Sequence, residues 1–331
     1  VLTTDGSGAV TFADAGGGAD LYAANPSSAT DPTANGLNSI AIGDGMTTGS
    51  SAVGGIAIGQ DGTVSGTNSI SLGKSGAYGT GSFAAAISSV SYQNYGADGD
   101  YSISVGYRSR ASSSGAVAIG YEPKALGNYS TAISRSYASG ADSFAAAIAS
   151  NSASYGATGA NSVAMGYRSK ANGSYGFAVG YQNIASGSYS AALGRNTTSA
   201  GAQGFAAGYL SEAAAVNSTA FGFRSKTRIE GQLAVTSGYF GAAGDAQSSI
   251  YTFRSDTTDA IAEALTTDNS TASTDNQIIL PNNSAYSFSG TIIARQQASQ
   301  GTACAAWKIE GLIRREGSAG TTVLVNSATT V

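Results

Sequence analysis

Hydrophobic residues alternate with small residues in short runs that recur along most of the chain. In NSIAIG at 38–43, Ile40 and Ile42 fall on one side of an extended chain, the small residues between them fall on the other, and Gly43 follows. A period of two is that of a β-strand. Comparable runs are GGIAIG at 54–59, NSISLG at 68–73, GAVAIG at 115–120 and NSVAMG at 161–166. The alternation therefore predicts many copies of one short strand.

These runs return at a nearly constant interval. From Gly166 to Gly222 the terminal glycines stand fourteen residues apart, and about thirteen copies lie between residues 38 and 222. Repeats of this kind form solenoids, in which each strand pairs with strands of the coils before and after it. The sequence thus predicts an all-β fold. A lead-in segment at 1–36 precedes a parallel β-roll of about 14-residue coils at 37–226, and a small sandwich-like β domain follows at 227–331.

The larger side chains of each run are predicted to fill the interior of the coil. The Ser, Ala and Gly face would then allow a neighbouring chain to approach closely. A coil of fourteen residues encloses a thin core, so we expect symmetric assembly, as a homotrimer, to supply the missing burial. The predicted repeat-core positions are Ile40, Ile42, Ile56, Ile58, Ile70, Leu72, Ile103, Val105, Val117, Ile119, Val163, Met165, Phe177, Val179 and Leu193.

A longer period of about sixty residues is superimposed on the short one. GYRSRA at 106–111 returns as GYRSKA at 166–171, and SFAAAIS at 82–88 returns as SFAAAIA at 143–149. Longer connections follow the two degenerate copies, at 89–100 and 150–161. We expect these connections to be loops that leave the roll at matching heights.

Composition narrows the functions that such a roll can have. The chain of 331 residues has 46 glycines, 11% charged residues and no histidine. The lack of histidine removes His-based catalytic triads and His metal ligands. A net charge of -4 without a basic block disfavours nucleic-acid binding, and no apolar run is long enough to span a membrane. We expect a non-enzymatic chain with no cofactor, no nucleic-acid partner and no membrane insertion.

The recurring S-x-A-x-G runs over about 38–226 resemble the YadA-like head repeats of trimeric autotransporter adhesins. That resemblance implies a left-handed parallel β-roll that assembles as a trimer. The flanks resemble bacteriophage proteins instead. LTTDGSGAVTF at 2–12 is similar to segments of tail-fibre proteins, and NQIILPNNSAYSFSGTIIARQQ with AAWKIEGLIRREGSAGTTVLV resembles a C-terminal domain of structural and fibre proteins of marine phages.

The sequence after residue 226 predicts further β structure, with one short helix as the exception. Alternation predicts strands at 250–256, 285–297, 302–316 and 321–325, and TDAIAEALT at 258–266 predicts a short helix. Cys304 lies beside Trp307 in one of these strands and is expected to be a small buried hydrophobe. The chain stops at Val331 just after a strand, so we expect the domain to continue beyond it.

Three groups of residues are candidates for binding. Aromatic residues follow the terminal glycine of several copies, as a stripe that either contacts host glycans or shields the turns. Arg108, Arg168 and Arg224 could contact an anionic polymer, or be solvated or bridge subunits. Asp98 and Asp100 could help to bind calcium, or lie in a solvated loop. The candidate glycan contacts are Tyr107, Tyr121, Tyr167, Tyr181, Tyr209 and Phe223.

The leading functional hypothesis is a fibre protein on the surface of a phage virion. Its expected partners are two further copies of itself, other virion structural proteins and a host cell-surface glycan or protein. The alternatives are the head of a bacterial trimeric surface adhesin, a capsid-decorating fibre, and a tailspike that cleaves polysaccharide. A tailspike would need a pair of carboxylates in a cleft, and no Asp or Glu pair recurs here.

Overall fold

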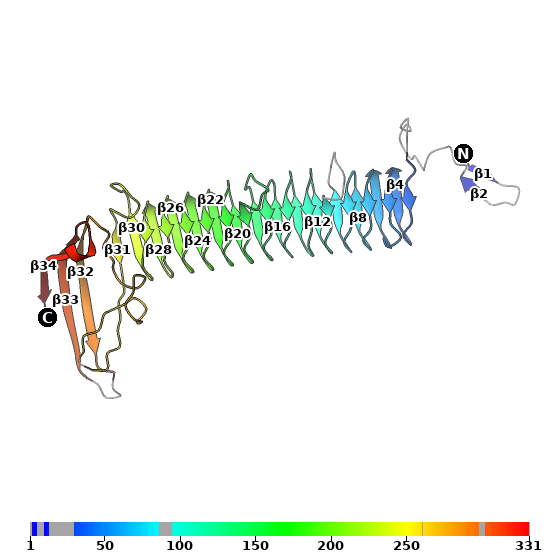
Figure 1. Cartoon of the computed structure of the whole chain (residues 1–331). Coiled ribbons are helices and arrows are strands. Elements are labelled where there is room, and N and C mark those ends of the chain that lie inside the picture. Colours follow the sequence, from blue (N-terminus) through cyan, green and yellow to red (C-terminus); the bar gives the residue numbers. More distant parts are fainter. Residues whose placement is uncertain are drawn as a thin grey trace.

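The protein is an elongated rod with a separate β-sheet near its C-terminal end (Figure 1). The computed structural model describes residues 2–4, 10–12, 30–85, 95–259, 261–297 and 302–330. An antiparallel pair, β1 (Leu2–Thr4) and β2 (Val10–Phe12), precedes the rod. The predicted all-β, parallel β-roll architecture is confirmed.

Two parallel sheets form the walls of the rod. The long-strand sheet contains β4 (Ile40–Asp44), β6 (Ile56–Gln60), β8 (Ile70–Leu72), β10 (Phe83–Ala85), β12 (Ile103–Val105), β14 (Val117–Ile119), β16 (Thr131–Ile133), β18 (Phe144–Ala146), β20 (Val163–Met165), β22 (Phe177–Tyr181), β24 (Ala191–Arg195), β26 (Phe205–Tyr209), β28 (Thr219–Phe223) and β30 (Leu233–Thr236). The short-strand sheet contains β3 (Thr33–Ala34), β5 (Thr47–Thr48), β7 (Thr63–Val64), β9 (Gly76–Ala77), β11 (Gly96–Ala97), β13 (Arg110–Ala111), β15 (Lys124–Ala125), β17 (Tyr137–Ala138), β19 (Gly156–Ala157), β21 (Lys170–Ala171), β23 (Ile184–Ala185), β25 (Thr198–Ser199), β27 (Glu212–Ala213) and β29 (Lys226–Thr227).

Every coil contributes one strand to each sheet, and the strands pair in register. Ala178 lies beside Ala164 on one side and Ala192 on the other, so like residues stack along the rod. Fourteen parallel strands follow one another in the long-strand sheet, from β4 to β30. At the usual spacing of paired strands the array is about 60–65 Å long.

The interior of the roll is lined by small side chains. Ala164, Ala178 and Ala192 of the long-strand sheet and Ala171 and Ala185 of the short-strand sheet are all 0% exposed and form one cluster. Buried serines complete the interior, as where the Ser162 hydroxyl donates to the Gly159 carbonyl oxygen at 2.6 Å. Because the corners are short and the sheets lie close together, most inward positions hold alanine or serine, and larger buried side chains such as Met46, Val64 and Ile148 occur at only a few coils.

The prediction that the large aliphatic residues fill the coil interior is therefore wrong. None of these side chains is buried, and Ile119, for example, is 42% exposed. Because side chains alternate along a strand, placing Ala118 inside puts Val117 and Ile119 outside. The small face, for the same reason, cannot be a contact between subunits. The residues that face outward instead of inward are Ile40, Ile42, Ile56, Ile58, Ile70, Leu72, Ile103, Val105, Val117, Ile119, Val163, Met165, Phe177, Val179 and Leu193.

Glycine is required where one coil's backbone touches the next. Gly180 has φ +125°, and a Cβ at this position would overlap the carbonyl oxygen of Gly194. Left-handed backbone of this kind favours glycine. The terminal glycine of the repeat therefore sets both the turn out of the long strand and the close stacking of coils.

The two degenerate copies stay within the roll. β10 and β18 pair with the strands on either side of them, like any other copy. After β18 the chain makes a longer excursion before β19, and Ile148 from this connection is buried against the alanine cluster. Half of the first predicted loop, residues 89–94, lies outside the described residues, so the matching heights of the two loops stay a prediction.

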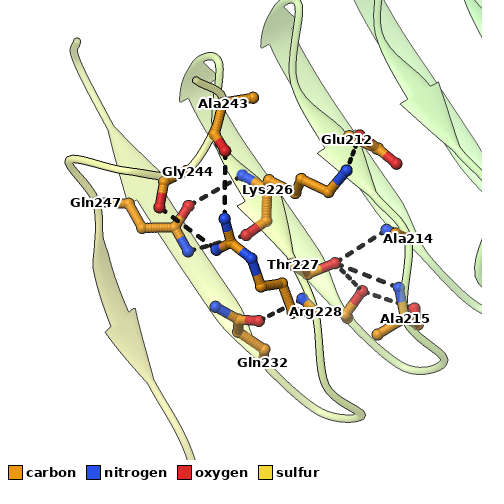
Figure 2. A network of polar contacts seen from close by, with 11 residues as sticks. Glu212, Ala214, Ala215, Lys226, Thr227, Arg228, Gln232, Ala243, Gly244 and Gln247 are labelled. Carbon is orange, nitrogen blue, oxygen red and sulfur yellow. Dashed lines mark hydrogen bonds and ion pairs between the residues drawn. The ribbon is translucent and has the colours of Figure 1, made fainter. Parts of the chain in front are cut away.

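The C-terminal end of the array is closed by the segment after β30. β31 (Ser248–Ile250) pairs antiparallel with β30 and covers the edge of the long-strand sheet. The side-chain amide of Gln247 covers the other sheet, accepting from Lys226 N at 3.0 Å and donating to Lys226 O at 2.9 Å, as Figure 2 shows. Arg228 donates to the carbonyl oxygens of Ala243 and Gly244 in the same network. These contacts satisfy backbone groups that an open sheet edge would leave unpaired.

The last segment forms one antiparallel sheet of three strands. These are β32 (Ser284–Arg295), β33 (Cys304–Arg315) and β34 (Val323–Thr330), and a short 3-10 turn, η2 (Ala319–Thr321), lies between the last two. The three strands predicted over 285–325 are confirmed. The described residues here form a single sheet rather than the two packed sheets of a sandwich. Cys304 is exposed, not buried as expected.

The helix predicted at 258–266 is wrong for the described residues of that segment. Arg254 and Thr266 pair instead through reciprocal backbone hydrogen bonds of 2.8 and 3.2 Å. This bridge closes a loop between them and is incompatible with a helix at Thr266. Only Ile250 of the strand predicted at 250–256 lies in a strand, at the end of β31.

Candidate functional site

Aromatic rings line the corner at which the chain leaves the long-strand sheet. We call the residues that directly follow the terminal glycine of each coil the corner stripe. Their rings stack from coil to coil, with centroids 5.2 Å apart for Tyr107–Tyr121, 5.1 Å for Tyr167–Tyr181 and 5.3 Å for Tyr209–Phe223. Tyr121, Tyr167, Tyr181 and Tyr209 are exposed, whereas Tyr107 and Phe223 are partly buried. The structure thus brings the six predicted residues to one corner of the rod.

Arginines interrupt and flank this stripe. Arg195 occupies the stripe position between Tyr181 and Tyr209, and its guanidinium lies 5.5 Å from the first ring and 5.0 Å from the second. Arg168 lies 5.2 Å from the Tyr167 ring and 5.6 Å from that of Tyr155. A guanidinium held over aromatic faces keeps its donors pointing outward. Sequence reasoning missed Arg195, although the fourteen-residue step from Tyr181 places it on the stripe.

The two other predicted arginines also lie against rings. Arg108 is 5.1 Å from the Tyr107 ring, and Arg224 is 3.9 Å from the ring of Tyr239. These four arginines are therefore held by aromatic contacts, and the stripe is a mixed surface of rings and cations rather than a plain aromatic ladder.

The residue after most stripe positions has left-handed backbone. Arg168 has φ +50° and Gln182 has φ +54°, and in the next coil Asn196 has φ +54°. Asparagine tolerates this region well, but for longer side chains it costs on the order of 1 kcal/mol. Long polar side chains at this corner are therefore placed there against their backbone preference.

One carboxylate beside the corner stripe is shared by two arginines. Glu122 Oε1 lies 3.3 Å from Arg108 Nη1, and its Oε2 lies 3.5 Å from Arg135 Nε. The arginines come from the coils before and after that of Glu122. The ion pairs thus cancel one of the two positive charges in this section of the corner.

Tyrosines also occupy the opposite corner, where the chain enters the long-strand sheet. Tyr101, Tyr129, Tyr175 and Tyr189 are exposed, and the rings of Tyr175 and Tyr189 stack at 4.6 Å with 4° between their planes. The structure therefore has an aromatic stripe on each side of the long-strand sheet.

The two aspartates considered for calcium serve local structure. An Asp100 carboxylate oxygen accepts a hydrogen bond from Thr80 N at 2.8 Å. Asp98 lies 4.0 Å from Arg110, and burial raises the pKa of its carboxyl while Arg110 acts to lower it. Within the described ranges, no three acidic or cysteine side chains gather as they would around a metal ion. Nor does any helix in that part of the chain have the length and hydropathy to cross a membrane.

The outward side of the long-strand sheet, which we call the apolar face, is the second notable surface. Its strands display aliphatic and aromatic side chains in register from coil to coil, including Ile119, Met165 and Phe221 at 40–42% exposure. The outward positions of the short-strand sheet are mostly polar, as at Lys124 and Lys170. Monomeric soluble proteins rarely expose apolar patches of more than a few hundred Å². The apolar face is therefore suited to a protein partner.

Comparison with known families identifies the repeats themselves. The YadA head domain repeat (2 copies) matches residues 33–45, 50–75, 97–122, 157–183, 175–197 and 199–225. These ranges fall within the coil array of the structure. No curated protein matches the chain. The chain thus carries YadA head domain repeats, which point to an adhesin-like fibre exposed on a surface.

Proposed function

We propose that this chain is a fibre protein of a bacteriophage virion, a homotrimeric rod that attaches the particle to the host surface. Each contact along the rod is weak, and three parallel copies raise the overall affinity through avidity. The observation that carries the proposal is the unbroken apolar face, because a single chain leaves it open to water.

Burial of the apolar face supplies ample free energy for assembly. The 42% exposure of Ile119 corresponds to about 75 Å² of surface, or about 2 kcal/mol if it is fully buried at 25 cal/mol per Å². Eleven large side chains of the apolar face are 38–47% exposed, and at about 2 kcal/mol each their burial exceeds the estimated association cost of about 4–15 kcal/mol. A threefold axis along the rod would let each apolar face contact the other two, with the polar short-strand sheets outside. The likeness to trimeric adhesin heads supports three copies.

The flanks support a virion rather than a cell surface. Residues 2–12, 276–297 and 305–325 resemble segments of phage fibre proteins, and the described part of the C-terminal region is an antiparallel sheet. The head of a bacterial surface adhesin is the second candidate, favoured by the YadA repeats. Immunogold labelling separates the two, because a virion protein labels purified particles and an adhesin labels the envelope of uninfected cells.

The trimer is tested by the mass of the native protein in solution. We expect about three times the chain mass of 32.6 kDa. Ile119→Asp should dissociate the assembly, since it places a carboxylate in the apolar contact of every subunit. Lys124→Asp changes the outward face of the short-strand sheet in the same coil and should leave the mass unchanged. A monomeric wild-type protein, or equal dissociation by both variants, would contradict the proposed packing.

The proposal includes no catalytic step. Attachment requires an extended surface with many equivalent contacts, which the repeated coils provide. Incubating the full chain with envelope polysaccharide should leave the polymer length unchanged, and shortened polymer would support the tailspike alternative instead.

A further inference from the structure

The sixty-residue period places two related sets of residues at this corner of the rod. Each set combines corner-stripe residues with the residues that directly follow them. The first contains Tyr107, Arg108, Tyr121, Glu122 and Arg135, and sixty residues later the second contains Tyr167, Arg168, Tyr181, Gln182 and Arg195. Every residue of the first set has the same or a closely similar counterpart in the second. The exception in charge is Glu122, whose counterpart is the neutral Gln182.

The backbone of the two copies is nearly the same. Glu122 N donates to Tyr107 O at 2.7 Å, and Gln182 N donates to Tyr167 O at 2.8 Å. Glu122 and Gln182 have φ of 51° and 54°. The stacked tyrosine pairs have the same 18° between their ring planes. In the first two coils the copies therefore differ mainly in charge. At the third corner the backbone differs as well, since Ser134 has φ +60° where Gly194 has φ +112°.

That charge difference leaves two cations available in the second copy. Glu122 pairs with both Arg108 and Arg135, at 3.3 and 3.5 Å, and so cancels one of their two positive charges. In the part of the chain that the structure describes, Arg168 and Arg195 make cation–π contacts but no ion pair. Both side chains are exposed. The acidic residue nearest along the chain, Glu212, is paired with Lys226 at 2.7 Å.

The surroundings of these arginines favour a sugar polymer as the ligand. Guanidinium groups bind carboxylates through paired hydrogen bonds, and exposed aromatic rings pack against the C–H faces of sugars. Arg168 and Arg195 lie about two coils apart, roughly 10 Å along the rod. Nucleic acid is less well suited, because it requires many phosphate contacts and the chain has a net charge of -4.

We propose that Arg168 and Arg195 bind carboxylate groups of an acidic polysaccharide that lies along the rod, with Tyr167, Tyr181 and Tyr209 stacking on its sugar rings. This site deepens the proposed attachment function and rests on it. Arg108 and Arg135 form the inactive counterpart, because Glu122 occupies the place that a ligand carboxylate would take.

The two copies supply their own matched variants. The probe is an oligogalacturonate, with a neutral glucose oligomer of equal length as control, titrated into the full-length assembled protein by calorimetry. We expect salt-sensitive binding of the acidic oligomer only. Gln182→Glu should weaken binding by about tenfold or more, since the new carboxylate can pair with both arginines. Gln182→Asn should bind like wild type, and Glu122→Gln should add a second site per chain.

Each outcome bears on the proposal. Equal binding by wild type and Gln182→Glu, equal binding of the neutral oligomer, or no binding of oligogalacturonate would overturn it. Tighter binding of a single-stranded oligonucleotide of the same charge would also overturn it. The native mass of Gln182→Glu shows whether a loss reflects assembly instead. If the wild-type protein is found on virions but does not bind oligogalacturonate, only this binding site is refuted. If the protein is a monomer that binds the oligomer, only the proposed trimeric rod is refuted.

Discussion

Because the interior of the roll is closed, we expect a larger side chain at Ala178 to destabilise the fold. This residue is 0% exposed, and Ala164 and Ala192 lie in register on either side of it. Ala178→Ile adds three carbon atoms between the two sheets. If there were room for them, the buried carbons would stabilise the fold by about 2 kcal/mol.

The structure shows no such room. Next to Ala178, a Cβ added to Gly176 would lie only 2.8 Å from the Gly173 carbonyl oxygen. The sheets cannot separate, because each coil is closed at both corners by hydrogen-bonded turns. Overpacking of a well-filled core costs about 1–3 kcal/mol. We therefore expect Ala178→Ile to destabilise each chain by roughly that amount.

The matched control is Thr198→Ile, which introduces the same side chain on the outward side of the short-strand sheet. Thr198 is partly exposed and pairs with Ile184, so this substitution should change stability by less than about 0.5 kcal/mol. The two variants are compared by thermal unfolding at one protein concentration, because the stability of an oligomer depends on concentration. Hydrogen exchange over residues 163–194 locates the effect. Equal melting temperatures for the two variants would refute the closed interior.

Three further predictions concern other parts of the chain. Gly180→Ala should destabilise the roll by well over 1 kcal/mol, because φ is +125° and the added methyl group would overlap the next coil. The control is Gly317→Ala, where an added Cβ has no atom within 4 Å. This control should leave the stability nearly unchanged in the same unfolding assay. Hydrogen bonds from Ser270 lower the pKa of Asp268 to about 2. The stability that the ionised Asp268 carboxylate contributes should therefore be complete above its ordinary pKa of 3.8 and be lost as the pH falls through about 2. An NMR titration of the carboxyl carbon would follow this change. Glu212→Gln removes a partly exposed 2.7 Å ion pair with Lys226 and should lower the free energy of unfolding by at most about 1 kcal/mol. The loss should be smaller at high salt, and a loss that does not depend on salt would contradict this prediction.

Much of the architecture follows from local sequence. The alternation in runs such as NSVAMG at 161–166 predicts strands, and the fourteen-residue step predicts that they stack as coils. Both are confirmed by the register of β20 with β22. The position of the aromatic stripe also follows from the period, since one residue per coil must recur at one corner. These features depend only on the backbone repeat, which every copy encodes.

The sidedness of the strands is different, because alternation defines two faces without saying which is inside. Ala164 and Val163 alternate equally well in either orientation. The inward face is decided by the distance between the sheets, which the short corners keep small. Alanine and serine therefore fill most inward positions, and larger buried side chains such as Val64 and Ile148 occur at only a few coils. That distance is a property of the closed coil and of no single copy.

Contacts across coils likewise needed the tertiary structure. Glu122 joins Arg108 and Arg135 only because stacking brings residues 13 and 14 positions away to the same corner. Gln247 completes the last rung of the short-strand sheet from 21 residues away. The sequence by itself determined the repeat, its strands and its period, because these are encoded in each copy. Only the tertiary structure decided which face is buried and which charges meet, because the first depends on the distance between the two sheets and the second on how the coils stack.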